Sequence, residues 1–115
     1  MEGRKRGAVA KSIFEAVESG RAVIYVPGLV FAEILYLSEK RRIAASLSDV
    51  ADYLAQYSGC REYPLSLAVI QAATQITDIP ELHDRLIAGT ARLLDLELMT
   101  NDPQIQTSVA VRTIW

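Results

Sequence analysis

The hydrophobic residues of this chain alternate between helical spacing and short continuous runs. Val9, Ile13 and Val17 recur at helical spacing, and Gly20 stands where such a helix would end. Residues 22–26 (AVIYV) form a continuous run rich in β-branched side chains, which predicts a strand buried on both faces. The same reasoning predicts helices at 29–42, from Ser46 or Ser48 onward, at 66–76 and at 84–95, and strands at 61–65, 97–100 and 109–115. Helices that alternate with strands predict an α/β fold with a parallel sheet covered on both faces.

The length and the amino-acid composition of the chain favour one domain in a reducing compartment. At 115 residues the chain is long enough for a single core, and we see no linker or repeat. One cysteine and one histidine exclude an intrachain disulfide and argue against a structural zinc site, so we expect a cytoplasmic protein. The longest apolar stretch is broken by Pro27 and Gly28 and is too short to cross a membrane. With a net charge of −2, any attraction to nucleic acid must come from local basic clusters or bound cations.

Three acidic residues are expected at one edge of the sheet. Asp102 directly follows the strand 97–100, and Asp84 begins the helix that leads into that strand. Glu33 lies in the second turn of the helix after the strand 22–26. The carboxyl ends of parallel strands meet at one edge, where α/β sheets bind ligands, so we expect the three carboxylates to converge.

Each acid also has a simpler interpretation. Asp84 can be the N-cap of its helix, and Asp102 followed by Pro103 matches an N-cap with proline at the first helical position. Glu33, which has apolar neighbours on both sides, can turn to solvent or pair with an arginine, but burial of an unpaired carboxylate is costly. Together the three acids fit Mg²⁺ or Mn²⁺ rather than zinc, and such clusters serve phosphoryl transfer.

Other catalytic patterns fit poorly. No glycine-rich phosphate loop follows a predicted strand, and no serine occupies a strained strand-to-helix turn. His83 is interpreted as a helix-start residue with local hydrogen bonds, and Cys60 as a small buried hydrophobic residue.

Three stretches give the chain a resemblance to a known family: VPGLVFAEILYL, LHDRLIAGTARLLDLELMTND and the ending VAVRTIW. With the helices between them they resemble the PIN domain, particularly the VapC-type toxins of bacterial and archaeal toxin–antitoxin pairs. The resemblance implies a three-layer α/β/α sandwich and a Mg²⁺- or Mn²⁺-dependent ribonuclease that cleaves single-stranded RNA or RNA loops. It also implies a homodimer that a small antitoxin protein inhibits. Carried over, it makes Glu33, Asp84 and Asp102 the metal ligands, with Thr100 orienting a water or a ligand.

The resemblance has one departure. PIN domains open with a central strand that ends in an aspartate of the metal site, whereas MEGRKRG, before the first predicted helix, cannot form an apolar strand. We therefore expect the chain to begin after that strand, either because the start codon is assigned too far downstream or because the gene is fragmentary. The strands 22–26 and 97–100 would then lose a neighbour or pair with each other. On this basis the 115-residue chain is expected to fold poorly, to aggregate and to be inactive.

Two other classes compete with an active nuclease. One is a non-catalytic PIN relic that retains only the dimer or antitoxin surface. The other is a signalling receiver domain, which also gathers acids at a sheet edge but needs a lysine after its last strand, and none follows Val109.

Two surfaces complete the predictions. Phosphate contacts are assigned to Lys40, Arg41, Arg42 and Arg85, although the first three could equally complement a helix C-terminus. The segment LVFAEILYL and the stripe of Val50, Leu54 and Tyr57 offer more apolar surface than a thin domain needs, which predicts a dimer or antitoxin surface.

Overall fold

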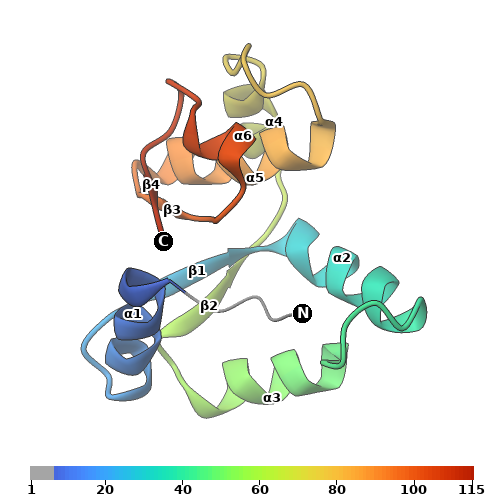
Figure 1. Cartoon of the computed structure of the whole chain (residues 1–115), viewed down its shortest axis with the longest axis vertical. Coiled ribbons are helices and arrows are strands. Elements are labelled where there is room, and N and C mark those ends of the chain that lie inside the picture. Colours follow the sequence, from blue (N-terminus) through green and yellow to red (C-terminus); the bar gives the residue numbers. More distant parts are fainter. Residues whose placement is uncertain (1–6) are drawn as a thin grey trace. The chain divides into compact units, whose positions relative to one another are not determined.

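The computed structural model describes residues 7–115, which fall into two compact units (Figure 1). The central unit comprises Ala16–Leu65. The C-terminal unit comprises Ser66–Trp115 together with the residues up to Glu15. The division falls within helix α1 (Ala8–Glu18), which ends just before Gly20 as predicted, with a positive φ of 80° at that glycine. Each unit is described by itself.

The central unit is built on two parallel strands. β1 (Ile24–Pro27) pairs with β2 (Cys60–Tyr63), so that Ile24 faces Cys60 in the register. The Ile24 N–H donates to the carbonyl of Gly59 at 2.7 Å, which extends the ladder by one residue. The connection between the strands contains α2 (Gly28–Glu39) and α3 (Leu47–Gln56), and such a long crossover is what parallel pairing requires.

Both strands of the central unit are shorter and more accessible than the sequence suggested. No residue of β1 is fully buried, and Tyr25 remains 37% exposed, its ring packed edge-on against Tyr63 at 6.1 Å. The prediction of a strand buried on both faces is therefore wrong for β1. A continuous apolar run reports hydrophobicity but cannot report how many layers cover the strand.

Helix α3 begins at a capping box, which decides between the two serines considered. The Ser46 Oγ accepts from the Asp49 N–H at 3.1 Å, and the Ser46 N–H donates to Asp49 Oδ2 at 2.8 Å. This exchange satisfies two donors that the first turn of a helix leaves without partners. Farther along the helix, the Tyr53 hydroxyl donates to Glu18 Oε2 at 2.8 Å. Burial, followed by this bond to Glu18, raises the pKa of Tyr53 to about 12.

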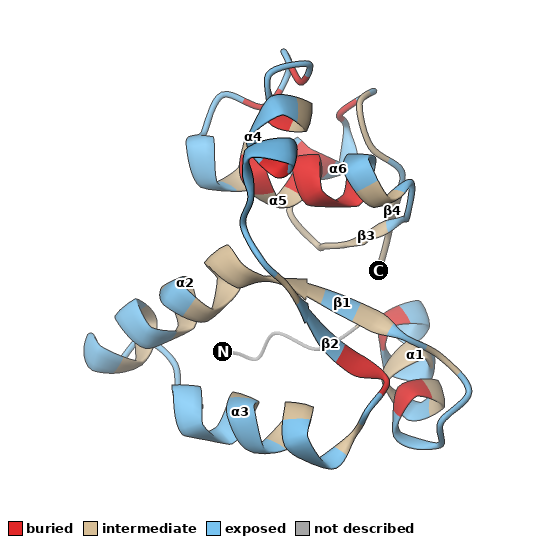
Figure 2. Cartoon of the chain, turned by 180° about the vertical axis from the view of Figure 1, so that it is seen from behind, coloured by how far each residue is buried: buried red, intermediate tan, exposed pale blue. Residues whose placement is uncertain are grey.

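Helix α2 ends earlier than predicted. It stops at Glu39 rather than at Arg42, and Arg41 beyond it has a positive φ of 56°. Although α2 is largely apolar, neither it nor α3 contains a fully buried residue, as the tan and blue ribbons in Figure 2 show.

The C-terminal unit is built around two packed helices. α5 (Leu82–Leu94) lies against α4 (Leu67–Ala73), whose first turn is capped by Ser66. The two helices approach so closely at Gly89 that a Cβ there would lie 3.1 Å from Val69 O and from the Cβ and N atoms of Ala73. The core of this unit consists of Ile76, Ile79, Ala88 and Ile105.

A short second ladder and one short helix follow α5. β3 (Leu98–Met99) pairs in parallel with β4 (Thr113–Ile114), and α6 (Pro103–Gln106) lies between them in the chain. The predicted strand 109–115 is thus reduced to its last part, and Val109 is 96% exposed. Among residues 7–115, each strand has one hydrogen-bonded neighbour, so the parallel strands form two two-stranded sheets.

The segment before β4 is held by side chains instead of a ladder. Asp78 accepts from the Ser108 hydroxyl at 2.7 Å and from the Val109 N–H at 2.8 Å. These two bonds lower the pKa of Asp78, the one from Ser108 being the larger cause. Arg92 Nη1 donates to the carbonyl of Ala110 at 2.9 Å. The α/β class with short parallel strands is confirmed, and no described helix is long and apolar enough to cross a membrane.

Candidate active site

Asp102 both caps a helix and lies where a sheet-edge ligand is expected. It follows β3 and is the N-cap of α6, with Pro103 at the first helical position, as the sequence predicted. Its Oδ1 accepts from the Gln104 N–H at 2.9 Å, and its own N–H donates to Thr100 Oγ1 at 3.1 Å. The Thr100 carbonyl in turn accepts from the Gln106 side chain at 3.0 Å. Thr100 and α6 therefore fix the conformation of Asp102.

Asp84 is not a cap. Helix α5 begins at Leu82, and its N-cap is Glu81, whose Oε1 accepts from the Asp84 N–H at 2.9 Å. The interpretation of Asp84 as an N-cap is therefore wrong, and the helix starts two residues before the predicted position 84. Asp84 lies in the first turn, where the positive end of the helix dipole favours a negative charge. Its carboxylate is not used in capping the helix.

Burial and neighbouring charges shift the pKa of Asp84. Its pKa is raised first by burial, then by the negative charges of Glu81 and Asp102, with an opposing effect from His83. The contribution of Asp102 indicates that the carboxylates at the two ends of the α5–β3 segment are close enough for their charges to interact. A raised pKa is the direction expected from mutual repulsion, although burial is the larger cause.

Glu33 lies in the other unit. It occupies the second turn of α2 and is half-buried. Its convergence with the two aspartates stays a prediction.

The remaining candidates lie on both units. Arg85 follows Asp84 in α5, and its Nε is buried and has no hydrogen-bond acceptor among the described residues. His83 Nδ1 lies 3.5 Å from Glu81 Oε2, in agreement with the local role expected of it. Cys60 is buried, and burial raises the pKa of its thiol. The exposed residues Lys40, Arg41 and Arg42 follow the end of α2 in the central unit.

Glu81 was missed by the sequence reasoning. The available signal was an acid three residues before Asp84, at a position where its side chain can accept from the Asp84 N–H.

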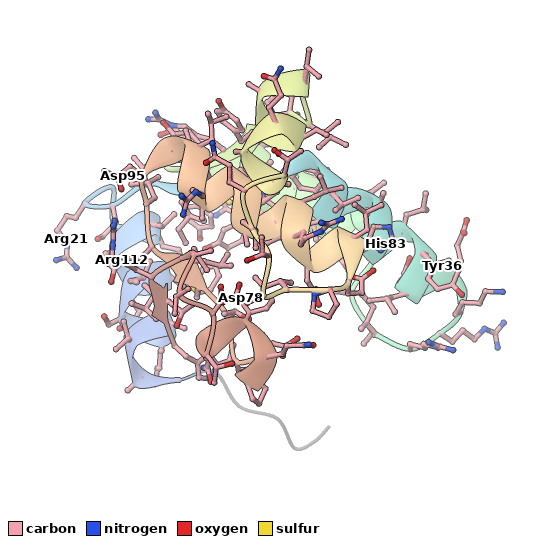
Figure 3. All side chains as sticks on the ribbon, turned by 90° about the horizontal axis from the view of Figure 1, so that it is seen from above. Arg21, Tyr36, Asp78, His83, Asp95 and Arg112 are labelled. Atoms are coloured by element: carbon pink, nitrogen blue, oxygen red, sulfur yellow. The ribbon has the colours of Figure 1, made fainter. Side chains whose placement is uncertain are left out.

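Figure 3 shows His83 at the beginning of α5 and Asp95 near its end. A hollow of 710 Å³ lies beside Asp95, Arg92 and Arg112, not at Asp84.

The chemistry of the aspartate pair suits a hard cation. Across residues 7–115, no three His, Cys, Asp or Glu side chains gather closely enough to hold a metal ion. Asp84 and Asp102 nevertheless supply carboxylate oxygens, and the charge of Asp102 is one cause of the raised pKa of Asp84, after burial and Glu81. A bound Mg²⁺ or Mn²⁺ would relieve the repulsion between the two charges, so the two residues fit such an ion.

Comparisons with known proteins identify the family. The sequence profile of the PIN domain matches residues 1–110. No curated protein matches the chain. Among solved structures, the chain is similar to VapBC2 from Rickettsia felis, which was crystallised with a DNA fragment from its promoter. The identity is 17% and the TM-score 0.68, over 91% of this chain and 82% of that one, which is a likeness of fold. The chain belongs to the PIN domain family, as the sequence predicted.

Proposed function

We propose that this chain is a metal-dependent endoribonuclease of the VapC-like type that hydrolyses phosphodiester bonds in RNA. Glu33, Asp84 and Asp102 are its metal ligands in this proposal, with Mg²⁺ or Mn²⁺ as the ion. The observation that carries the proposal is the placement of two carboxylates, with Asp84 in the first turn of α5 and Asp102 directly after the strand β3 to which α5 leads. The charge of Asp102 is also one cause of the raised pKa of Asp84, after burial and Glu81. Membership of the PIN family and the fold shared with VapBC2 support it.

The residues of this site have separable roles. When bound, the cation supplies an activated water and neutralises charge on the scissile phosphate. Asp84 and Asp102 hold it through carboxylate oxygens. Thr100 is a positioning residue, because its Oγ1 accepts from the Asp102 N–H and so holds the backbone from which that carboxylate projects. Arg85, which forms no ion pair with a carboxylate among the described residues, contacts a substrate phosphate through the terminal nitrogens of its guanidinium.

The test uses variants that keep the helix caps. Asp102→Asn retains an oxygen that can accept from the Gln104 N–H, whereas Asp102→Ala removes both the cap and the ligand. We expect Asp84→Asn and Asp102→Asn to reduce Mn²⁺-dependent cleavage of single-stranded RNA at least about 100-fold, since even residues that support a metal ligand contribute about 10–100-fold. Asp95→Asn, at the other end of α5, removes the same charge and should leave cleavage unchanged.

Two results would contradict the proposal. One is cleavage that survives both asparagine substitutions. The other is a wild-type chain that folds cooperatively but never cleaves RNA with either ion, which would favour the non-catalytic relic. A second readout is independent of activity: Mg²⁺ should lower the pKa of Asp84, measured by NMR titration of its carboxyl carbon, in the wild type but not in Asp102→Asn.

The proposed partners are a second copy of the chain and a small antitoxin protein. The support is that α2 is mostly apolar yet contains no fully buried residue, with Leu35 43% exposed. Exposed apolar surface of this kind is typical of protein–protein contacts. Leu35→Glu should lower the molecular mass measured by light scattering from a dimer to a monomer. A wild-type chain that is monomeric at all concentrations would contradict the homodimer.

A further inference from the structure

The turn after α2 gathers positive charge in an unusual backbone. The Arg41 N–H donates to the Ser38 carbonyl at 3.0 Å and the Arg42 N–H to the Leu37 carbonyl at 2.9 Å, which closes the helix end. This closure puts Arg41 at a φ of 56°, in the left-handed region where such helix ends usually carry glycine. An arginine there is strained, so the fold alone does not account for this residue.

The cations of this turn are not balanced by carboxylates among the described residues. Lys40 is the C-cap of α2 and Arg41 and Arg42 follow it, so the helix dipole favours them, although only weakly for charges as exposed as these. Within residues 7–115, none of the three cations forms an ion pair with a carboxylate. All three are exposed, on a chain whose net charge is −2.

An aromatic ring lies beside these cations. The Lys40 Nζ is 5.7 Å from the centroid of the Tyr36 ring, and Tyr36 is 53% exposed. Figure 3 shows Tyr36 pointing outward from α2 at its C-terminal end. The ammonium of Lys40 lies over one face of this half-exposed ring, so the other face is the flat apolar surface that the ring can offer next to the cluster of positive charge.

This combination fits single-stranded nucleic acid. Proteins bind such strands with cations that follow the phosphates and aromatic rings on which bases stack. A duplex offers the same phosphates but keeps its base faces stacked inside, so it cannot use the ring. We propose that Tyr36 and the turn Lys40–Arg42 form a binding surface for single-stranded RNA, in which Tyr36 stacks on a base and the three cations contact phosphates. This inference rests on the proposed ribonuclease function for its ligand, but it concerns binding and not cleavage.

The decisive variant is Arg41→Gly. Glycine removes the charge and also relieves the left-handed strain, so thermal stability should stay equal or rise while RNA affinity falls. Binding is measured by fluorescence anisotropy on the full chain with a labelled single-stranded oligoribonucleotide, with EDTA present to prevent cleavage. Loss of one phosphate contact should reduce the slope of log affinity against log salt by about 0.7.

Tyr36 is tested by a matched pair. Tyr36→Leu keeps an apolar side chain but loses the ring, and should weaken binding of the single strand about 5- to 150-fold, the equivalent of one stacked base. Tyr36→Phe should restore affinity, and binding of a duplex should not respond to either substitution. Arg21→Gln is the charge control, since Arg21 lies in the same unit on the side away from Tyr36 in Figure 3.

The outcomes separate this proposal from the nuclease function. Unchanged affinity and salt slope in both Arg41→Gly and Tyr36→Leu would overturn it, even if the wild type cleaves RNA. A change of oligomeric state in Tyr36→Leu without a change in RNA affinity would also overturn it and assign the surface to a protein partner. Weakened binding in both variants, with a wild type that binds RNA but does not cleave it, would support the surface while removing the nuclease.

Discussion

Replacing Gly89 with alanine tests how tightly α5 packs against α4, and hence how firmly the helix that begins beside Asp84 is held. The new Cβ would lie 3.1 Å from the Cβ and N of Ala73 and from the carbonyl oxygen of Val69. Favourable carbon contacts need about 3.5–4.0 Å, so α4 must move by a few tenths of an ångström. Two of the three neighbouring atoms belong to the backbone, and Val69 and Ala73 are buried at 0% and 5% exposure, so no rotamer change can provide the space.

Two opposing effects set the expected magnitude. Alanine is a better helix former than glycine by about 1 kcal/mol. Overpacking of a close-packed contact costs about 1–3 kcal/mol. The net result is a loss of about 1 kcal/mol, which should lower Tm by about 4–8 °C.

The assay is thermal and urea denaturation followed by circular dichroism. Ala51→Gly, at an exposed position in the middle of α3, is the control for propensity alone and should lose about 1 kcal/mol without any packing contribution. A Gly89→Ala chain that is more stable than wild type by about 1 kcal/mol would refute the reasoning, because α4 would then yield without cost.

Three further outcomes are expected. Hydrogen bonds lower the pKa of Asp78 in the folded chain, so its contribution to the free energy of unfolding is fully present above pH 3.8, the ordinary pKa of an aspartate. That contribution is lost as the pH falls through the lower pKa of the folded state. Asp78→Asn should therefore remove this part of the pH dependence of urea unfolding. The Cys60 thiol, buried and with a raised pKa, should react with a disulfide reagent only as fast as the central unit opens, so rapid native-state labelling would contradict its burial. Glu81→Gln removes a negative charge but keeps a cap acceptor, so the pKa of Asp84 should fall in an NMR titration, and an unchanged value would show that Glu81 does not act on it.

Local chemistry was predictable where a short motif decides it. The serine cap of α3 and the Asp-Pro start of α6 depend only on neighbours in the chain, and both were anticipated. The start of α5 was missed because glutamate is an uncommon N-cap, so the more usual aspartate, Asp84, was preferred. Strand burial and length were also missed, since apolar runs such as the one around Val109 do not report which segments pair or cover them.

One part of the candidate-site prediction depends only on neighbouring segments of the chain. Asp84 and Asp102 flank one helix–strand segment, so the alternation of elements was enough to suggest their proximity. Glu33 comes from a distant segment, and its place depends on long-range arrangement that a periodic pattern does not encode. The strained Arg41 had no signal in the sequence, because only the backbone closure at the end of α2 makes its conformation unusual.

The aromatic residues divide between the two units in a way that makes each unit visible separately in fluorescence. The only tryptophan, Trp115, belongs to the C-terminal unit, where its carbonyl accepts the N–H groups of Val9 and Ala10, each at 3.1 Å. All five tyrosines, at 25, 36, 53, 57 and 63, lie in the central unit. Excitation at the red edge of the absorption band, where tyrosine does not absorb, therefore reports on the C-terminal unit through Trp115. Tyrosine emission reports on the central unit. Transitions that coincide would mean that the chain melts as one cooperative body, and separated transitions would give each unit a stability of its own.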